Sequence, residues 1–256
     1  MHPATAARAE AWYPVFLDLR GRRCVVVGGG AMAADKAREL GAAGARVTVV
    51  AARPESAVEA MARGGQVRLR RRRFRDGDLA GAWLAIAAGD DDAEREEVRR
   101  EAWRRRLPFN SVDDLPRCSF IAGAVVRRGA LTVAISTAGR APALAVRLRQ
   151  WLERRLGAEH ARFLDLAGSV RAALAASVPD ATRRRELWYA LVDSDALALL
   201  RWGDEAAARR RFAEILGIEP PAPPAPDCNP KFPAGEGGPA LPADPAALAP
   251  ASGETR

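Results

Sequence analysis

The stretch CVVVGGGAMAADKA, from Cys24 to Ala37, runs from apolar β-branched residues into three consecutive glycines and then into a helical pattern. Glycine weakens strands and helices, so bare backbone here predicts the close approach of another group. The spacing Gly28-x-Gly30-x-x-Ala33 between a strand and a helix is typical of dinucleotide-binding turns, where the helix N-terminus faces a pyrophosphate. We therefore expect Gly28, Gly29 and Gly30 to bind a dinucleotide; a tight turn without a ligand is the alternative.

Short apolar runs alternate with helical patterns on both sides of this stretch. The runs cover residues 24–27, 46–50, 66–70, 83–88 and 108–112, and the helical patterns cover 31–44, 54–63 and 90–106. Parallel strands need crossover connections of this length, and the continuously apolar run at 83–88 is typical of a strand covered on both faces. The pattern predicts an α/β fold with a Rossmann-type parallel sheet.

The pattern changes after Asp113. Residues 129–137 read as a strand, 141–157 as an amphipathic helix, and 159–217 as short helices with breaks near Pro179 and Gly203. The remainder is rich in Pro, Ala and Gly and cannot build a core. We predict four parts: a cofactor-binding domain (1–119), a small α+β segment (120–156), a helical domain (157–218) and a disordered tail (219–256).

Composition excludes some classes of protein. The 256-residue chain carries a net charge of +8, but its arginines are interleaved with acids, and the run RLRRRRFR (68–75) has no nucleic-acid-binding motif beside it. No segment resembles a signal peptide or a membrane span. The three cysteines are far apart and form no metal or disulfide pattern. We expect a cytoplasmic protein that binds neither nucleic acid, nor a membrane, nor a structural metal.

Ligands of such a sheet lie at the carboxyl ends of its strands. These ends are expected at Gly28–Gly30, Ala51–Arg53, Ala88–Asp90 and Asp113. Asp90 is a ligand candidate, although it or Asp91 could instead cap the next helix. Asp113 precedes no obvious helix and is the better catalytic candidate, because the only histidines, His2 and His160, lie outside this region.

The end of the second strand leaves the choice of cofactor open. An acid usually stands there to bind the adenosine ribose, but this chain has Ala51 and Ala52, and Glu55 is its first acid. Arg53 could meet the 2′-phosphate of NADP. The motif alone therefore predicts a dinucleotide without deciding between NAD and NADP.

Three longer segments carry a more specific resemblance. They are YPVFLDLRGRRCVVVGGGAMAADKARELGAAGARVTVVA, FRDGDLAGAWLAIAAGDDD and PFNSVDDLPRCSFIAGAVVRRGALTVAISTAGRAPALAVRLRQWLE. In order and spacing they resemble the precorrin-2 dehydrogenase/sirohydrochlorin ferrochelatase module of siroheme synthases. The resemblance is close over about residues 12–155 and looser to about 217.

The resemblance implies an activity and a set of site residues. The activity is NAD-dependent oxidation of precorrin-2 to sirohydrochlorin and, in many members, insertion of ferrous iron to give siroheme. It implies a homodimer with its interface in 120–156. Asp113 would be catalytic. The cofactor would meet Gly28, Gly29, Gly30, Ala31, Met32, Ala51, Ala52, Arg53, Ala88, Gly89 and Asp90, and the substrate would meet Arg117, Ser119, Phe120, Arg128 and Thr137.

Three departures from the family pattern fall near these residues. Gly89 stands where Thr is usual, Gly123 where Pro is usual, and Ala138 where the first of two glycines is usual. The family habit favours NAD over NADP. A module of another class, one that senses NAD and regulates a partner without catalysis, would keep the glycines but would not need the segment from Asp113 to Phe120.

Overall fold

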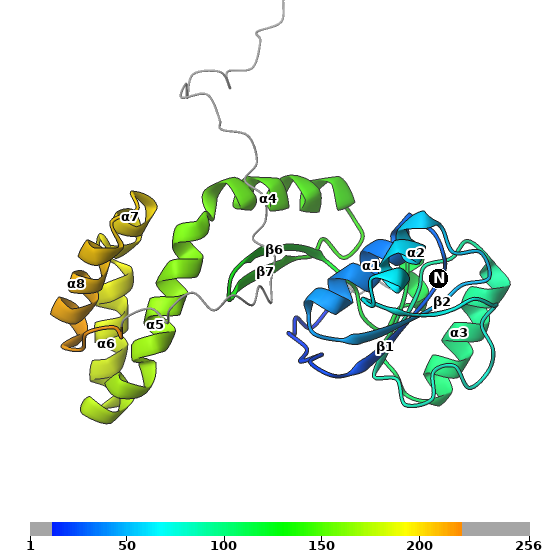
Figure 1. Cartoon of the computed structure of the whole chain (residues 1–256), viewed down its shortest axis with the longest axis horizontal. Coiled ribbons are helices and arrows are strands. Elements are labelled where there is room, and N and C mark those ends of the chain that lie inside the picture. Colours follow the sequence, from blue (N-terminus) through cyan, green and yellow to red (C-terminus); the bar gives the residue numbers. More distant parts are fainter. Residues whose placement is uncertain (1–11, 222–256) are drawn as a thin grey trace, which may run out of the picture.

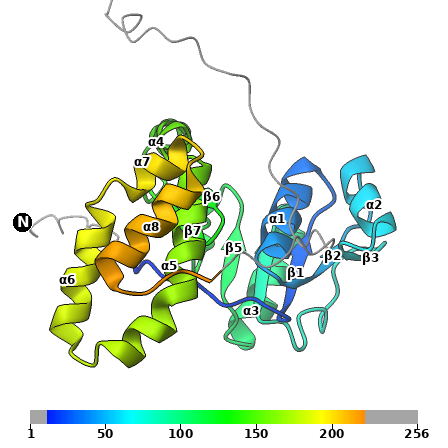
Figure 2. The ribbon, with the colours of Figure 1, turned by 60° about the vertical axis from the view of Figure 1, so that its left-hand side comes forward.

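The computed structural model describes residues 12–221, and the predicted tail beyond Pro221 lies outside the described residues. The chain forms three successive parts: a sheet domain, a hairpin with one long helix, and a group of helices (Figure 1). Figure 2 shows the hairpin lying between the other two parts.

The sheet domain holds five parallel strands in the order β3-β2-β1-β4-β5. They are β1 (Arg23–Val27), β2 (Arg46–Val50), β3 (Arg68–Arg70), β4 (Leu84–Ala87) and β5 (Phe109–Ser111). This arrangement confirms the predicted Rossmann-type sheet. The strand order puts the end of β1 between the ends of β2 and β4, where a ligand can reach all three.

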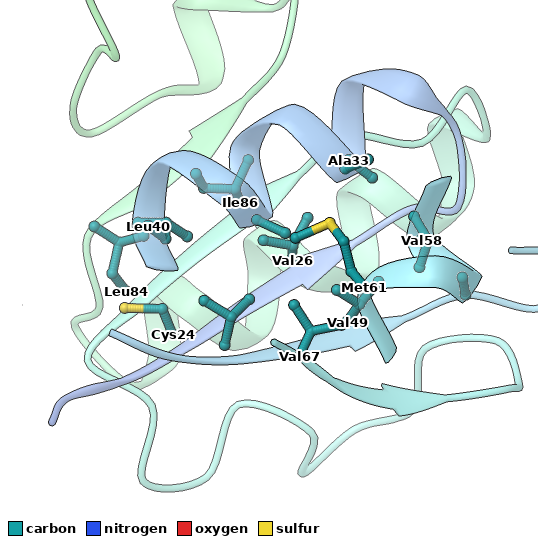
Figure 3. Packing of buried hydrophobic residues seen from close by; sticks show 14 of the residues in the cluster. Cys24, Val26, Ala33, Leu40, Val49, Val58, Met61, Val67, Leu84 and Ile86 are labelled. Carbon is teal, nitrogen blue, oxygen red and sulfur yellow. The ribbon is translucent and has the colours of Figure 1, made fainter. Parts of the chain in front are cut away.

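Helices cover both faces of the sheet. One face packs against α1 (Ala31–Ala42) and α2 (Ser56–Arg63), with Val26, Val49 and Met61 in its core (Figure 3). The other packs against α3 (Asp92–Arg104). Alternate residues of β1 serve the two cores, which explains why this strand is apolar at nearly every position.

The middle part is an antiparallel hairpin, β6 (Ala124–Arg128) and β7 (Leu131–Ile135), followed by α4 (Pro142–Arg155). The sequence predicted a single strand over 129–137. The structure shows two strands, because Gly129 takes the left-handed conformation (φ +55°) and turns the chain back. The short helix η1 (Leu115–Arg117) joins β5 to this part.

The last part consists of α5 (Ala158–Ser177), α6 (Ala181–Val192), α7 (Ala196–Arg201) and α8 (Glu205–Leu216). Phe163 and Phe212 meet edge to face in its core, with ring centroids 5.3 Å apart. Over residues 12–221, none of the helices has the length and hydrophobicity needed to cross a membrane.

The arginine run that follows β2 is part of the fold. Arg70 and Arg72 pair with Asp78, Arg71 pairs with Glu59, and Arg73 pairs with Asp91. The Asp78 side chain is almost wholly buried, so two of these arginines serve to neutralise an internal carboxylate. The run therefore ties the β3 region to α2 and α3, and most of its charge faces acids of the same domain.

Candidate active site

The glycine turn after β1 is built by close approach of neighbouring loops. Gly28 has φ +138°, and a Cβ there would lie 2.7 Å from the Ala88 carbonyl carbon. A Cβ on Gly29 would lie 2.3 Å from the Arg53 carbonyl oxygen. Both glycines are therefore required by protein contacts, whether or not a ligand is bound.

Gly30 is different, because it opens α1. It is the N-cap residue of the helix, and no side chain caps it. The free N–H groups of the first turn therefore have their partial positive charge available to an anion. This uncapped helix start next to a tight glycine turn fits the pyrophosphate of a dinucleotide.

The other predicted cofactor residues surround this turn. Ala31 and Met32 are exposed at the start of α1, and Ala52 and Arg53 are exposed after β2. Ala51 is buried in the core, and its N–H donates to the Arg70 carbonyl oxygen at 3.1 Å. The side chain of Ala51 therefore belongs to the core of the domain, and its role in cofactor binding stays a prediction.

The end of β4 resolves the alternatives for Asp90. Asp91 caps α3, since its Oδ1 accepts from the N–H groups of Ala93 at 3.0 Å and Glu94 at 3.1 Å. The pKa of Asp91 is lowered, mainly by the hydrogen bond from the Glu94 N–H and then by the hydrogen bond from Arg73. Asp90 therefore does not cap α3, and its exposed side chain lies at the sheet edge, directly after Ala88 and Gly89.

Asp113 follows β5 at the same edge. Its backbone is left-handed (φ +61°), which is uncommon for a residue with a side chain and stores local strain. Its side chain is exposed. It makes no hydrogen bond or ion pair with any other residue between 12 and 221. The neighbouring Asp114 is committed instead, with Oδ2 lying 3.0 Å from Arg117 Nη1.

The side chains of two predicted substrate residues, Ser119 and Arg128, make hydrogen bonds to the backbone of the chain. The Ser119 hydroxyl accepts from the Phe109 N–H at 2.7 Å and so holds the loop against β5. Arg128 donates to the carbonyl oxygens of Leu156 at 2.6 Å, Glu153 at 2.9 Å and Arg127 at 2.8 Å. The Arg128 guanidinium thus closes the end of α4, and its role in substrate binding stays a prediction.

The remaining three predicted substrate residues differ in their freedom. Arg117 pairs with Asp114 and lies 4.0 Å from Asp92, but its side chain is half exposed. Phe120 packs on the α1 side of the sheet. Thr137 accepts from the Ala141 N–H at the start of α4, at 3.3 Å. Arg117 is the one whose charged end can still turn toward an acidic ligand.

Cys118 is a supporting residue that the sequence did not indicate. Its thiol donates to the carbonyl oxygens of Ser111 at 3.2 Å and Asp114 at 3.3 Å, and its sulfur accepts from the Ser111 N–H. Burial raises the pKa of this thiol. Cys118 thus stays a neutral donor that fixes the bend carrying Asp113, and a cysteine five residues after an aspartate gives no sequence signal of that role.

Known proteins share this organisation. Residues 15–124 match the family model of an NAD(P)-binding domain, 128–155 the central region of sirohaem biosynthesis proteins, and 159–216 the sirohaem synthase dimerisation region. The part named for dimerisation thus lies later in the chain than the segment 120–156 expected from the sequence.

Individual relatives agree with the family models. A siroheme synthase of Azotobacter vinelandii is 38% identical over 212 residues, covering 82% of this chain and 46% of the relative. One from Photobacterium profundum is 37% identical over 204 residues, covering 80% and 44%. The chain thus spans less than half the length of these relatives.

A solved structure extends the likeness to three dimensions. The protein described as SirC, precorrin-2 dehydrogenase, superposes with a TM-score of 0.66 at 25% identity, covering 81% of this chain and 100% of its own. The uncapped glycine turn, the strand order and the three matched regions occur together in one chain. The chain is therefore similar to siroheme synthases over 80–82% of its length, and it carries in order an NAD(P)-binding region, the central region of sirohaem biosynthesis proteins and the sirohaem synthase dimerisation region.

Proposed function

We propose that this chain oxidises precorrin-2 to sirohydrochlorin, with NAD as the hydride acceptor. The observation that carries the proposal is the pairing, on one sheet edge, of an uncapped glycine turn with the uncommitted carboxylate of Asp113. Their strands β1 and β5 are separated only by β4, so the two ends lie about 10 Å apart, two inter-strand spacings. The relatives support the choice of substrate, since the SirC structure is described as a precorrin-2 dehydrogenase.

The residues divide the work as follows. Gly28, Gly29 and Gly30 would hold the pyrophosphate of NAD, which when bound supplies the acceptor for a hydride. The substrate loses a hydride and a proton in this two-electron oxidation, and Asp113 accepts the proton. The exposed arginines Arg117, Arg127 and Arg140 would meet the acidic side chains of the macrocycle.

We propose ferrous iron as a further substrate at this edge, because the relatives are named siroheme synthases. Asp113 would then also accept pyrrole protons as the metal enters. We place both reactions in the cytoplasm, since Cys24 and Cys118 are free thiols, as is usual in a reducing compartment.

The test is direct. Purified protein is incubated anaerobically with precorrin-2 and NAD, while the tetrapyrrole spectrum and NADH formation are followed together. We expect one NADH for each sirohydrochlorin formed, and ferrous iron added afterwards should give the spectrum of siroheme. If NAD binds tightly but no tetrapyrrole is oxidised, the alternative of a non-catalytic NAD-sensing module is favoured instead.

A further inference from the structure

Glu55 lies where the loop after β2 crosses the glycine turn. Its N–H donates to the Gly29 carbonyl oxygen at 2.8 Å, and the same loop brings the Arg53 carbonyl against Gly29. Glu55 is the N-cap residue of α2, but its side chain does not cap that helix. The carboxylate is exposed and is free of hydrogen bonds and ion pairs with residues 12–221.

The carboxylate turns toward the start of α1 instead. A Cβ built on Gly30 would lie 3.3 Å from Glu55 Oε1 and 4.0 Å from Oε2. A negative group thus stands beside Gly30, the second glycine of the Gly28-x-Gly30 motif, and the hydrogen bond from the Glu55 N–H to the Gly29 carbonyl oxygen holds the loop that carries it. The side chain reaches the cofactor turn although Glu55 comes five residues after the end of β2.

This placement has a chemical meaning for a dinucleotide. In related folds an acid at the end of the second strand accepts hydrogen bonds from the adenosine ribose hydroxyls. Here the strand ends in Val50 and is followed by Ala51 and Ala52, which can make no such bond. A carboxylate beside Gly30 can accept the ribose hydroxyl, whereas the 2′-phosphate of NADP would place like charge against it.

We propose that Glu55 binds the adenosine ribose and selects NAD against NADP, in place of the missing acid at the end of β2. The inference rests on the proposed dehydrogenase function and adds the residue that sets cofactor choice. Arg53 is exposed two residues earlier and makes no ion pair within the described chain. Once the Glu55 charge is removed, Arg53 becomes the group that could hold a 2′-phosphate.

The experiment measures cofactor affinity rather than turnover. Titration calorimetry with NAD and with NADP compares the full chain with Glu55→Gln, Glu55→Gln combined with Arg53→Ala, and Glu59→Gln. Glu59 is the matched control, because it lies in the first turn of the helix that Glu55 precedes but pairs with Arg71. A hydrogen bond to a charged group corresponds to roughly a ten- to hundredfold change in affinity.

We expect the unaltered chain to prefer NAD. Glu55→Gln should shift the NAD:NADP affinity ratio toward NADP by at least roughly tenfold. The double variant should lose this gain in NADP affinity. Glu59→Gln should leave the ratio unchanged. If Glu55→Gln lowers thermal stability but keeps the ratio, the carboxylate serves only the N-terminus of α1, and the inference is wrong.

An equal rise in the affinities for NAD and NADP in Glu55→Gln would also overturn the inference, because Glu55 would then merely repel the pyrophosphate that both cofactors carry. If the unaltered chain binds neither cofactor, the proposed function itself fails, whereas NAD binding with an unmoved ratio defeats this inference alone.

Discussion

Asp113 combines a left-handed backbone with a carboxylate that the fold does not use, whereas its neighbour Asp114 is paired with Arg117. A strained residue persists where the surrounding structure determines it, here through Cys118 and the bonds at Ser111. The two adjacent aspartates therefore have different roles: Asp113 is free to contact a ligand, and Asp114 stabilises the bend through its ion pair with Arg117.

Asp113→Asn keeps the size of this side chain and removes its basic oxygen. Loss of a general base typically lowers the rate roughly 10²–10⁴-fold, so we expect steady-state dehydrogenation to fall by that order while NAD affinity stays unchanged. Asp114→Asn is the control, and its rate should fall much less. Near-normal turnover by Asp113→Asn would move the base elsewhere.

Ala138 is another left-handed residue, with φ +50°, at a position where the pattern of the family that the sequence resembles has glycine. The left-handed conformation costs a residue with a side chain about 1–2 kcal/mol, and part of this is offset by the extra freedom of glycine in the unfolded chain. We expect Ala138→Gly to raise the free energy of unfolding by about 0.5–1 kcal/mol in urea titrations.

Ala134→Gly provides the contrast for that measurement. Ala134 lies in β7 opposite Val125, where extended backbone suits any residue, so glycine there should lower stability by a similar amount. Destabilisation of both variants would mean that the strain at Ala138 is relieved by its surroundings.

At the scale of elements, one buried carboxylate joins β3 to the loop that follows it. Asp78 accepts from Arg72 at 2.7 Å, from the Arg75 N–H at 2.9 Å, and from Arg70. Burial alone would raise the pKa of Asp78, but the bonds from Arg72, Arg75 and Arg70 outweigh it and the pKa is lowered.

A pKa lowered in the folded state sets the sign of the pH dependence. Asp78 contributes stability above the pKa of an unfolded aspartate, about 3.9, and this contribution disappears as the pH falls through the lower folded value. We therefore expect Asp78→Asn to be less stable than the unaltered chain near neutral pH, with the difference shrinking below about pH 4 in urea titrations. Asp76→Asn, at an exposed pair with Arg104, should show almost no difference at either pH.

At the scale of the whole molecule, some features could be predicted from sequence because their cause is local. The strands β1, β2 and β4 are buried on both faces and read as apolar runs, and the glycine turn carries its own spacing. Other features depend on partners distant in sequence. Arg128 is held by carbonyls 25 and 28 residues away, and the arginines after β2 by acids on α2 and before α3, so neither could be assigned from composition.

Strand β6 was missed for a related reason. It ends in two arginines and follows Gly123, so nothing in AVVRR separates it from a loop. Its stability comes from pairing with β7 and packing under α4, which are tertiary contacts. A two-stranded sheet is marginal alone, and the outer edges of both strands are unpaired within residues 12–221.

Exposed apolar side chains lie along α4 beside this hairpin, with Leu144, Leu148 and Trp151 between 40% and 52% exposed. Tyr189 and Val192 form a second exposed apolar set on α6, inside the region matched to dimerisation. Such faces are usually covered by a partner, and a symmetric homodimer is the commonest way to cover them. We therefore expect the chain to be a homodimer in light scattering at micromolar concentration.

Two charge-introducing variants decide which surface forms the interface. If α4 and the hairpin lie at its centre, Leu148→Glu should give a monomer that keeps its helical circular dichroism, because a buried unpaired charge disfavours association strongly. Tyr189→Glu should then remain dimeric, since α6 would lie at the rim. The reverse result would place the interface on the helices from 159 to 216 and remove the role expected for 120–156. If the unaltered chain is a monomer at every concentration, both placements of the interface are wrong. The unpaired edges of β6 and β7 would then be exposed to water.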